Sequence, residues 1–237
     1  LIFWPLWMTG TRKAPKLNKE EIKNLIPVSI LHSLVHIGGV VSMGAGAVSF
    51  AHIVKASEPA VSAALSAIFL KSFLPLPVYL TLLPVMGGVA LASLGELTFT
   101  WKAFNYAMLS NVASASRGIV GKVTMGQSIG QNMNATNLYS VLTILATILL
   151  LPIAIILEGN AFIPTLNALF EAGSGKTYVI QTVLAGLFYY LYNEVAFLCL
   201  DNVAPVTHAL GNTIKRVVII IASVLAFGTK MTTQGII

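Results

Sequence analysis

The strongest constraint on the fold is a succession of long stretches that contain no charged side chain. They cover residues 24–54, 72–95, 103–116, 123–157, 177–193 and 217–229. A helix rises 1.5 Å per residue, so about 20 apolar residues cross the roughly 30 Å hydrocarbon core of a bilayer. Since most of the stretches approach or exceed that length, the sequence predicts an all-α, polytopic transmembrane helix bundle.

Composition supports a membrane setting. The chain is 56% hydrophobic and only 9% charged, with a mean hydropathy of +0.84, whereas an ordinary soluble domain is about 25% charged. The single cysteine, Cys199, lies in an apolar run and provides neither a disulfide framework nor a cysteine metal site. We therefore expect no metal and no cofactor.

The predicted spans alternate with short connections. We place them at 1–9 (partial), 24–43, 46–70, 75–95, 100–121, 135–157, 177–200 and 204–227, with another beginning near residue 233. Both ends of the chain fall inside a span and there is no initiator Met, so we expect 1–237 to be one membrane domain and a fragment of a longer protein. Small residues at 38–49, "GGVVSMGAGAVS", predict close helix packing.

Basic residues gather on alternate connections, which sets the orientation. One face carries Arg12, Lys13, Lys16, Lys19, Lys23, Lys71 and Lys122, and the other carries Lys102, Lys176 and Lys230 together with Glu96, Glu158 and Glu171. The basic face is expected on the cytoplasm-like side. The net charge of +6 therefore reflects topology and does not indicate a nucleic-acid partner.

Three cations fall inside predicted spans. Lys215 lies ten residues into span 204–227, about 15 Å deep, with Arg216 beside it, and Lys55 lies about 13 Å into span 46–70. His36 falls near the middle of span 24–43, and Tyr192 in the second half of span 177–200. Asp201 or Asn202 is expected to cap the last span, with Pro205 in its first turn.

Something anionic must stabilise these cations, because each costs at least ~2.5–3.5 kcal/mol at the bilayer midplane. Structural pairing is one alternative, with Lys55 next to Glu58 and with Lys215 or Arg216 against Glu194. A bound anion is the other, and we favour it because ionisable residues inside a membrane are most often functional. "VSFAHIVK" (48–55) and "APVTHALGNTIKR" (204–216) form a weak internal echo, as in transporters with inverted repeats.

Several motifs resemble the plastid phosphate translocators of the drug/metabolite transporter superfamily. They are "RKAP…LIPVSILHSL", "AVSFAHIVKASEPA", "FYYLYNEVAFLCLDNVAPVTHALGNTIKRV" and "AFGTKMTTQ", in the family's order along nearly the whole chain. The resemblance implies ten helices in two inverted repeats, of which about eight are present here. Residues 1–95 would then belong to the first repeat and 100–237 to the second.

The resemblance also implies an activity and a site. The activity is exchange of inorganic phosphate for a phosphorylated three-carbon compound, triose phosphate or 3-phosphoglycerate, across a plastid inner envelope membrane. The implied phosphate-binding residues are Lys55, Lys215, Arg216, Tyr192 and His36. No catalytic residue is implied, and membrane lipid is the remaining partner.

Some positions depart from the family pattern and bear on the substrate. Glu194 stands where Gln is expected and needs Arg117 or another cation as its partner, or a proton. Ser114 replaces an aromatic residue and enlarges the pocket, and Gly39 stands where some members have a hydroxyl. Hexose-phosphate, pentose-phosphate and phosphoenolpyruvate antiport, and nucleotide-sugar transport, stay as alternatives.

Hypotheses from other functional classes have less support. The sequence contains no H-E-x-x-H and no G-x-S-x-G motif, so we do not expect an enzyme. "GSGKT" at 173–177 imitates a phosphate loop, but Phe170 occupies the position of its first glycine, and we interpret the stretch as a linker. A scaffold protein would leave the intramembrane cations unexplained.

Overall fold

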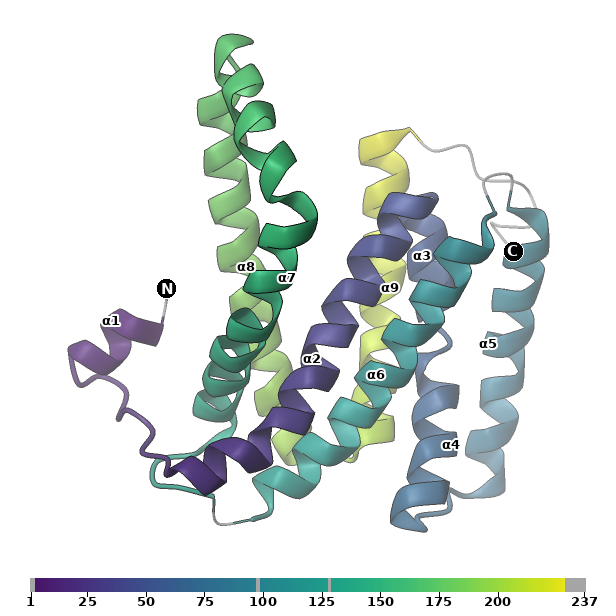
Figure 1. Ribbon diagram of the computed structural model, residues 1–237. Helices are drawn as coiled ribbons and strands as arrows, with labels where there is room; N and C mark the ends of the chain where they lie inside the picture. The colour runs from purple at the N-terminus through teal and green to yellow at the C-terminus, as the bar shows by residue number, and fades with distance from the viewer. Residues whose placement is uncertain (1–2, 97–98, 128, 229–237) are drawn as a thin grey trace. The chain divides into compact units, whose positions relative to one another are not determined.

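The computed structural model describes residues 3–96, 99–127 and 129–228, which are helical apart from their connections and one isolated bridge between Lys16 and Gln131. The helices are α1 (Phe3–Met8), α2 (Lys19–Ala45), α3 (Val48–Lys55), α4 (Glu58–Leu70), α5 (Leu76–Gly95), α6 (Trp101–Met125), α7 (Ala135–Glu171), α8 (Gly175–Asn202) and α9 (Pro205–Phe227) (Figure 1). Six segments of the described chain are long and apolar enough to cross a membrane, and one of them is α3 and α4 taken together. The predicted all-α, polytopic membrane fold is confirmed.

Two of the predicted spans differ in detail from the helices of the structure. The span predicted at 46–70 is interrupted at Ala56 and Ser57, so it forms α3 and α4. The span predicted to end at 157 continues as α7 to Glu171, because a lone Glu158 and two internal prolines do not stop the helix. The start predicted near residue 233 lies outside the described residues.

The predicted cap of the last span was also wrong. Asp201 and Asn202 are the last two residues of α8, so neither caps α9. Ala204 takes the N-cap position with extended backbone and without a side-chain cap, while Pro205 begins α9 as expected. Proline suits that position because a first-turn residue donates no hydrogen bond within the helix.

Packing divides the chain into two units, drawn from residues 1–33 with 125–201 and from residues 34–124 with 202–237. We call them unit 1 and unit 2. The predicted repeats, 1–95 and 100–237, concern internal symmetry rather than packing, and they stay a prediction.

Unit 1 has an aromatic core and an N-terminal loop that is held by hydrogen bonds. The Tyr139 ring lies 5.7, 5.2 and 5.0 Å from the rings of His32, Tyr190 and Phe197. In the loop, Lys16 and Gln131 exchange two backbone hydrogen bonds of 3.0 and 2.9 Å. Asn18 and Glu21 then form a reciprocal capping box that begins α2.

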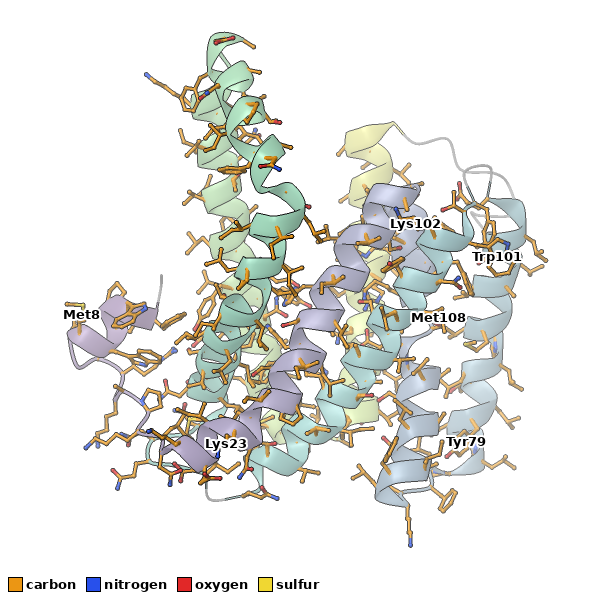
Figure 2. The ribbon with its side chains drawn as sticks, in the orientation of Figure 1. Met8, Lys23, Tyr79, Trp101, Lys102 and Met108 are labelled. Atoms are coloured by element: carbon orange, nitrogen blue, oxygen red, sulfur yellow. The ribbon has the colours of Figure 1, made fainter. Side chains whose placement is uncertain are left out.

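Unit 2 is organised around the interrupted helix, because both α5 and α9 contact α3 and α4. The second half of α2 packs on α6 so closely that a Cβ on Gly38 would lie 2.7 Å from the Tyr106 carbonyl oxygen. Ser42 adds a 2.8 Å hydrogen bond to the Ala103 carbonyl. In Figure 2, Lys102 of α6 and Tyr79 of α5 mark opposite ends of this unit.

Candidate anion-binding site

The interruption between α3 and α4 is held open by a side chain from α6. The Asn111 amide donates hydrogen bonds to the Val54 carbonyl (3.0 Å) and to the Ser57 hydroxyl (2.9 Å), and Ser57 donates to the same carbonyl over 2.8 Å. The Val54 carbonyl, which would accept from the backbone of residue 58 in a continuous helix, thus accepts from the side chains of Asn111 and Ser57. Met108, labelled in Figure 2, lies one turn earlier on α6 and contacts Ser57. Discontinuous helices at membrane depth are typical of transporter binding sites.

Each end of the interruption carries a charge of the favourable sign. Lys55 is the last residue of α3, where the partial negative charge of the helix end favours a cation. Glu58 is the first residue of α4, where the partial positive charge favours an anion. The Lys55 ammonium donates to the Ser110 hydroxyl, which donates onward to the Val35 carbonyl over 2.9 Å. Lys55 is thereby fixed against α6.

Glu58 joins three helices in the interior of unit 2. Arg216 of α9 donates from Nη2 to its Oε2 over 2.5 Å, and Ser114 of α6 donates to its Oε1 over 2.6 Å. Glu58, Arg216 and Ser114 are only 3%, 6% and 8% exposed. Both carboxylate oxygens are therefore bound inside the protein.

The cations predicted at membrane depth lie near one another in unit 2. The charges of Arg216, Glu58, Arg117 and Lys215 all act on Lys55. Those of Arg117 and Lys55 act on His36 of α2. Four of the five predicted phosphate-binding residues (His36, Lys55, Lys215 and Arg216) and the accessory Arg117 are thus brought together, and their binding role stays a prediction.

Two further accessory residues, Ser114 and Gly39, also lie in unit 2. Ser114 and Arg117 lie three residues apart on α6, on the helix face that also carries Ser110. A Cβ on Gly39 of α2 would stand 4.0 Å from the Ser110 hydroxyl, so a hydroxyl at position 39 would fit there. Ser114 also has a structural role, because its hydroxyl donates a hydrogen bond to Glu58.

Two of the predicted site residues belong to unit 1. Tyr192 of α8 is 38% exposed, and its ring lies 5.9 Å from that of Tyr189. Glu194 is buried and forms an ion pair with Arg12, so the cation expected to accompany it is Arg12 and not Arg117. The role of Tyr192 in binding phosphate stays a prediction.

The ion pairs weighed from the sequence have other partners in the structure. Arg216 pairs with Glu58 instead of Glu194, and Lys55 donates to Ser110 while it interacts with Glu58 through charge alone. The partners differ because the sequence gives the depth of a residue on its helix but not the rotation of one helix against another.

Sequence reasoning missed three residues around the site. Ser110 lies four residues before the predicted Ser114 on α6, a spacing that could have revealed it. His52, one turn before Lys55, lies in the field of Arg216, Lys55 and Lys215, and its Nδ1 is buried without a hydrogen-bond partner. Asn111 carried no signal, because its role depends on the interruption.

Among the described residues, no group of three or more His, Cys, Asp and Glu side chains could hold a metal.

A family model described as the Triose-phosphate Transporter family matches residues 1–237. The chain belongs to the Triose-phosphate Transporter family. The resemblance to phosphate translocators is thereby confirmed, and membership places the chain among transporters.

Curated relatives within this family are identical to the chain at about two fifths of the aligned positions. The triose phosphate/phosphate translocator, chloroplastic, of Pisum sativum is 41% identical over 230 residues, covering 96% of this chain and 56% of the relative. The Zea mays protein of the same name is 41% identical over 96% of this chain and 55% of its own length. The glucose-6-phosphate/phosphate translocator 2, chloroplastic, of Arabidopsis thaliana is 40% identical over 95% of this chain and 57% of the relative. The chain spans about half the length of these curated relatives.

Proposed function

We propose that this protein is an antiporter that exchanges inorganic phosphate for a phosphorylated three-carbon compound, triose phosphate or 3-phosphoglycerate, across a plastid inner membrane. The observation that carries the proposal is the gathering of Arg117, Lys215, Arg216 and Glu58 about Lys55 in unit 2, with Arg216 paired to Glu58. The names of the relatives support the substrate class and the plastid location. Membrane lipid surrounds the protein, and no nucleic acid takes part.

The chemistry of the site suits a phosphate group. Near pH 7 phosphate carries between one and two negative charges and several acceptor oxygens. A planar guanidinium such as that of Arg216 binds two of these oxygens at once, while ammonium groups such as Lys55 and Lys215 act as compact point charges. His36, which lies in the same unit as these cations, would add a hydrogen bond to the same group.

The excess of positive charge gives a reason for strict exchange. The site holds several buried cations and one carboxylate. Closing the helices over it, without water, between the two access states is unfavourable unless an anion accompanies the cations. A conformational change is promoted only by a ligand that stabilises it, and phosphate would do so. The carrier would therefore change its access side mainly when loaded.

A phosphorylated hexose is the second candidate substrate. One relative 40% identical to this chain is named for glucose 6-phosphate. Gly39 and Ser114 are both small, and they would leave room for a longer carbon chain beside the cations. Nucleotide sugars would need still more room, for base and ribose.

Counter-exchange in liposomes tests the proposal. Liposomes that contain the full-length protein are preloaded in turn with triose phosphate, 3-phosphoglycerate, phosphoenolpyruvate, glucose 6-phosphate or UMP, and the uptake of labelled phosphate is measured. Uptake that requires a three-carbon phosphate inside supports the proposal, and preference for glucose 6-phosphate or UMP selects an alternative. Absence of exchange with every phosphate contradicts the translocator function.

A further inference from the structure

The Glu58 carboxylate sits where an anionic substrate would compete with it. Arg216, a residue of the proposed phosphate site, already donates to Glu58 over 2.5 Å. An arginine that binds both a carboxylate and a phosphate must divide its five N–H donors between them. Glu58 is therefore part of the electrostatics of the site and is not simply a neighbour.

Arg216 has donor capacity left beyond this ion pair. The hydrogen bond to Glu58 uses Nη2, while Nε is buried and has no hydrogen-bond partner. Buried donors nearly always have a partner, so an exception in an arginine that is 94% buried points to a ligand or to a shift of the guanidinium. A phosphate oxygen is an acceptor of the required charge.

The charge count shows why this carboxylate matters. Glu58 interacts through charge with Lys55 and Arg216, and Lys55 also lies in the fields of Arg117 and Lys215. By sequence, unit 2 contains one other acidic residue, Glu96, which follows the end of α5. Glu58 is thus the carboxylate that offsets this group of four cations.

We propose that Glu58 is the internal counter-anion of the phosphate site: it competes with phosphate for Arg216 and so keeps phosphate binding weak enough for release. This inference rests on the proposed function. Phosphate entering the site draws the guanidinium from Glu58, and on release the guanidinium returns to the carboxylate. Ser114 limits the competition, because its hydroxyl satisfies the second carboxylate oxygen.

Glu58→Gln tests the charge with little change of shape. Glutamine keeps an oxygen that accepts from Arg216, but it removes the negative charge. In phosphate–phosphate counter-exchange by the full-length protein, the KM for phosphate should fall by roughly fivefold or more and the maximal rate should also fall. Stabilisation of the detergent-solubilised protein against heat by inorganic phosphate should begin at a correspondingly lower concentration. Glu96→Gln, the matched control, should change neither quantity.

Ser114→Ala provides a second test with the opposite sign. Without the hydroxyl, Glu58 accepts more strongly from Arg216, so the KM for phosphate should rise. If the Glu58→Gln protein is not recovered folded, the Ser114→Ala variant alone tests the counter-anion role. An unchanged or lower KM for phosphate in Ser114→Ala contradicts that role.

The outcomes distinguish failure of the counter-anion role from failure of the proposed antiport function. A KM that rises or stays unchanged in Glu58→Gln, with normal exchange by the wild type, overturns the counter-anion role and leaves the antiporter in place. A wild-type protein that exchanges no phosphate overturns both.

Discussion

Arg216 and Glu58 form a buried ion pair of 2.5 Å that joins α9 to the first residue of α4. The pair lies beside Lys55, at the interruption of the helix that crosses unit 2. One hydrogen bond therefore links α9, which carries two adjacent cations, to the start of α4, directly after the interruption that follows Lys55.

Removing Arg216 should abolish transport and also destabilise the fold. Arg216→Ala loses the guanidinium and leaves the Glu58 carboxylate buried without its partner, which typically costs about 3–5 kcal/mol. We expect phosphate exchange in liposomes to fall by roughly two orders of magnitude, with a lower unfolding temperature in detergent.

The double variant Arg216→Met with Glu58→Gln separates these two effects. Since both charges are removed together, stability should recover toward that of the wild type while exchange stays absent. Recovery of exchange would show that Arg216 does not bind the substrate.

Gly38 should be indispensable for the packing of α2 on α6. In Gly38→Ala the new methyl group would lie 2.7 Å from the Tyr106 carbonyl oxygen, so the helices must move apart, at a cost of roughly 1–3 kcal/mol. The neighbouring Gly39→Ala is the control, because its methyl group stands 4.0 Å from the Ser110 hydroxyl. Thermal unfolding in detergent should distinguish the two variants, and equal midpoints would refute the close approach.

Arg12 should stabilise unit 1 through Glu194. Arg12→Met leaves a buried carboxylate unpaired, so we expect a loss of about 1–3 kcal/mol and faster proteolysis of the N-terminal loop. Adding Glu194→Gln should restore most of the loss, because the amide carries no charge. If the double variant is as unstable as Arg12→Met, the ion pair is not the cause.

The Asn111 side chain should hold the helix interruption in place. Asn111→Ala removes the hydrogen bonds to Val54 and Ser57, which should cost about 1–3 kcal/mol and raise the KM for phosphate through displacement of Lys55. Ser93→Ala, on α5, is a suitable control, because it removes a single local bond to Val89. An unchanged KM in Asn111→Ala would separate the interruption from substrate binding.

The helices could be predicted from the sequence, and with them the helix on which each cation lies, since both follow from the length of apolar runs. Pro205 as the first residue of α9 is an example, because proline fixes a helix start locally. The resemblance of the motifs also led to the correct family.

The partners of the charges could not be predicted, because they depend on the rotation and the spacing of helices far apart in sequence. Arg216 meets Glu58 across 158 positions, and Glu194 meets Arg12 across 182. The interruption after Lys55 had a weak local signal in Ser57 and Pro59, but an uninterrupted apolar span predicted the same residues as one helix.

The length of α7 has a consequence for detecting the protein's orientation. At 37 residues it extends about 55 Å, well beyond the roughly 30 Å of a hydrocarbon core, and ordinary tilts do not absorb the difference. Part of the α7–α8 hairpin must therefore stand in water. Gly173, at its turn, adopts a left-handed conformation in open surroundings. An epitope inserted there would be reached by an antibody from one side of the membrane, and so would report which compartment faces the weakly basic connections.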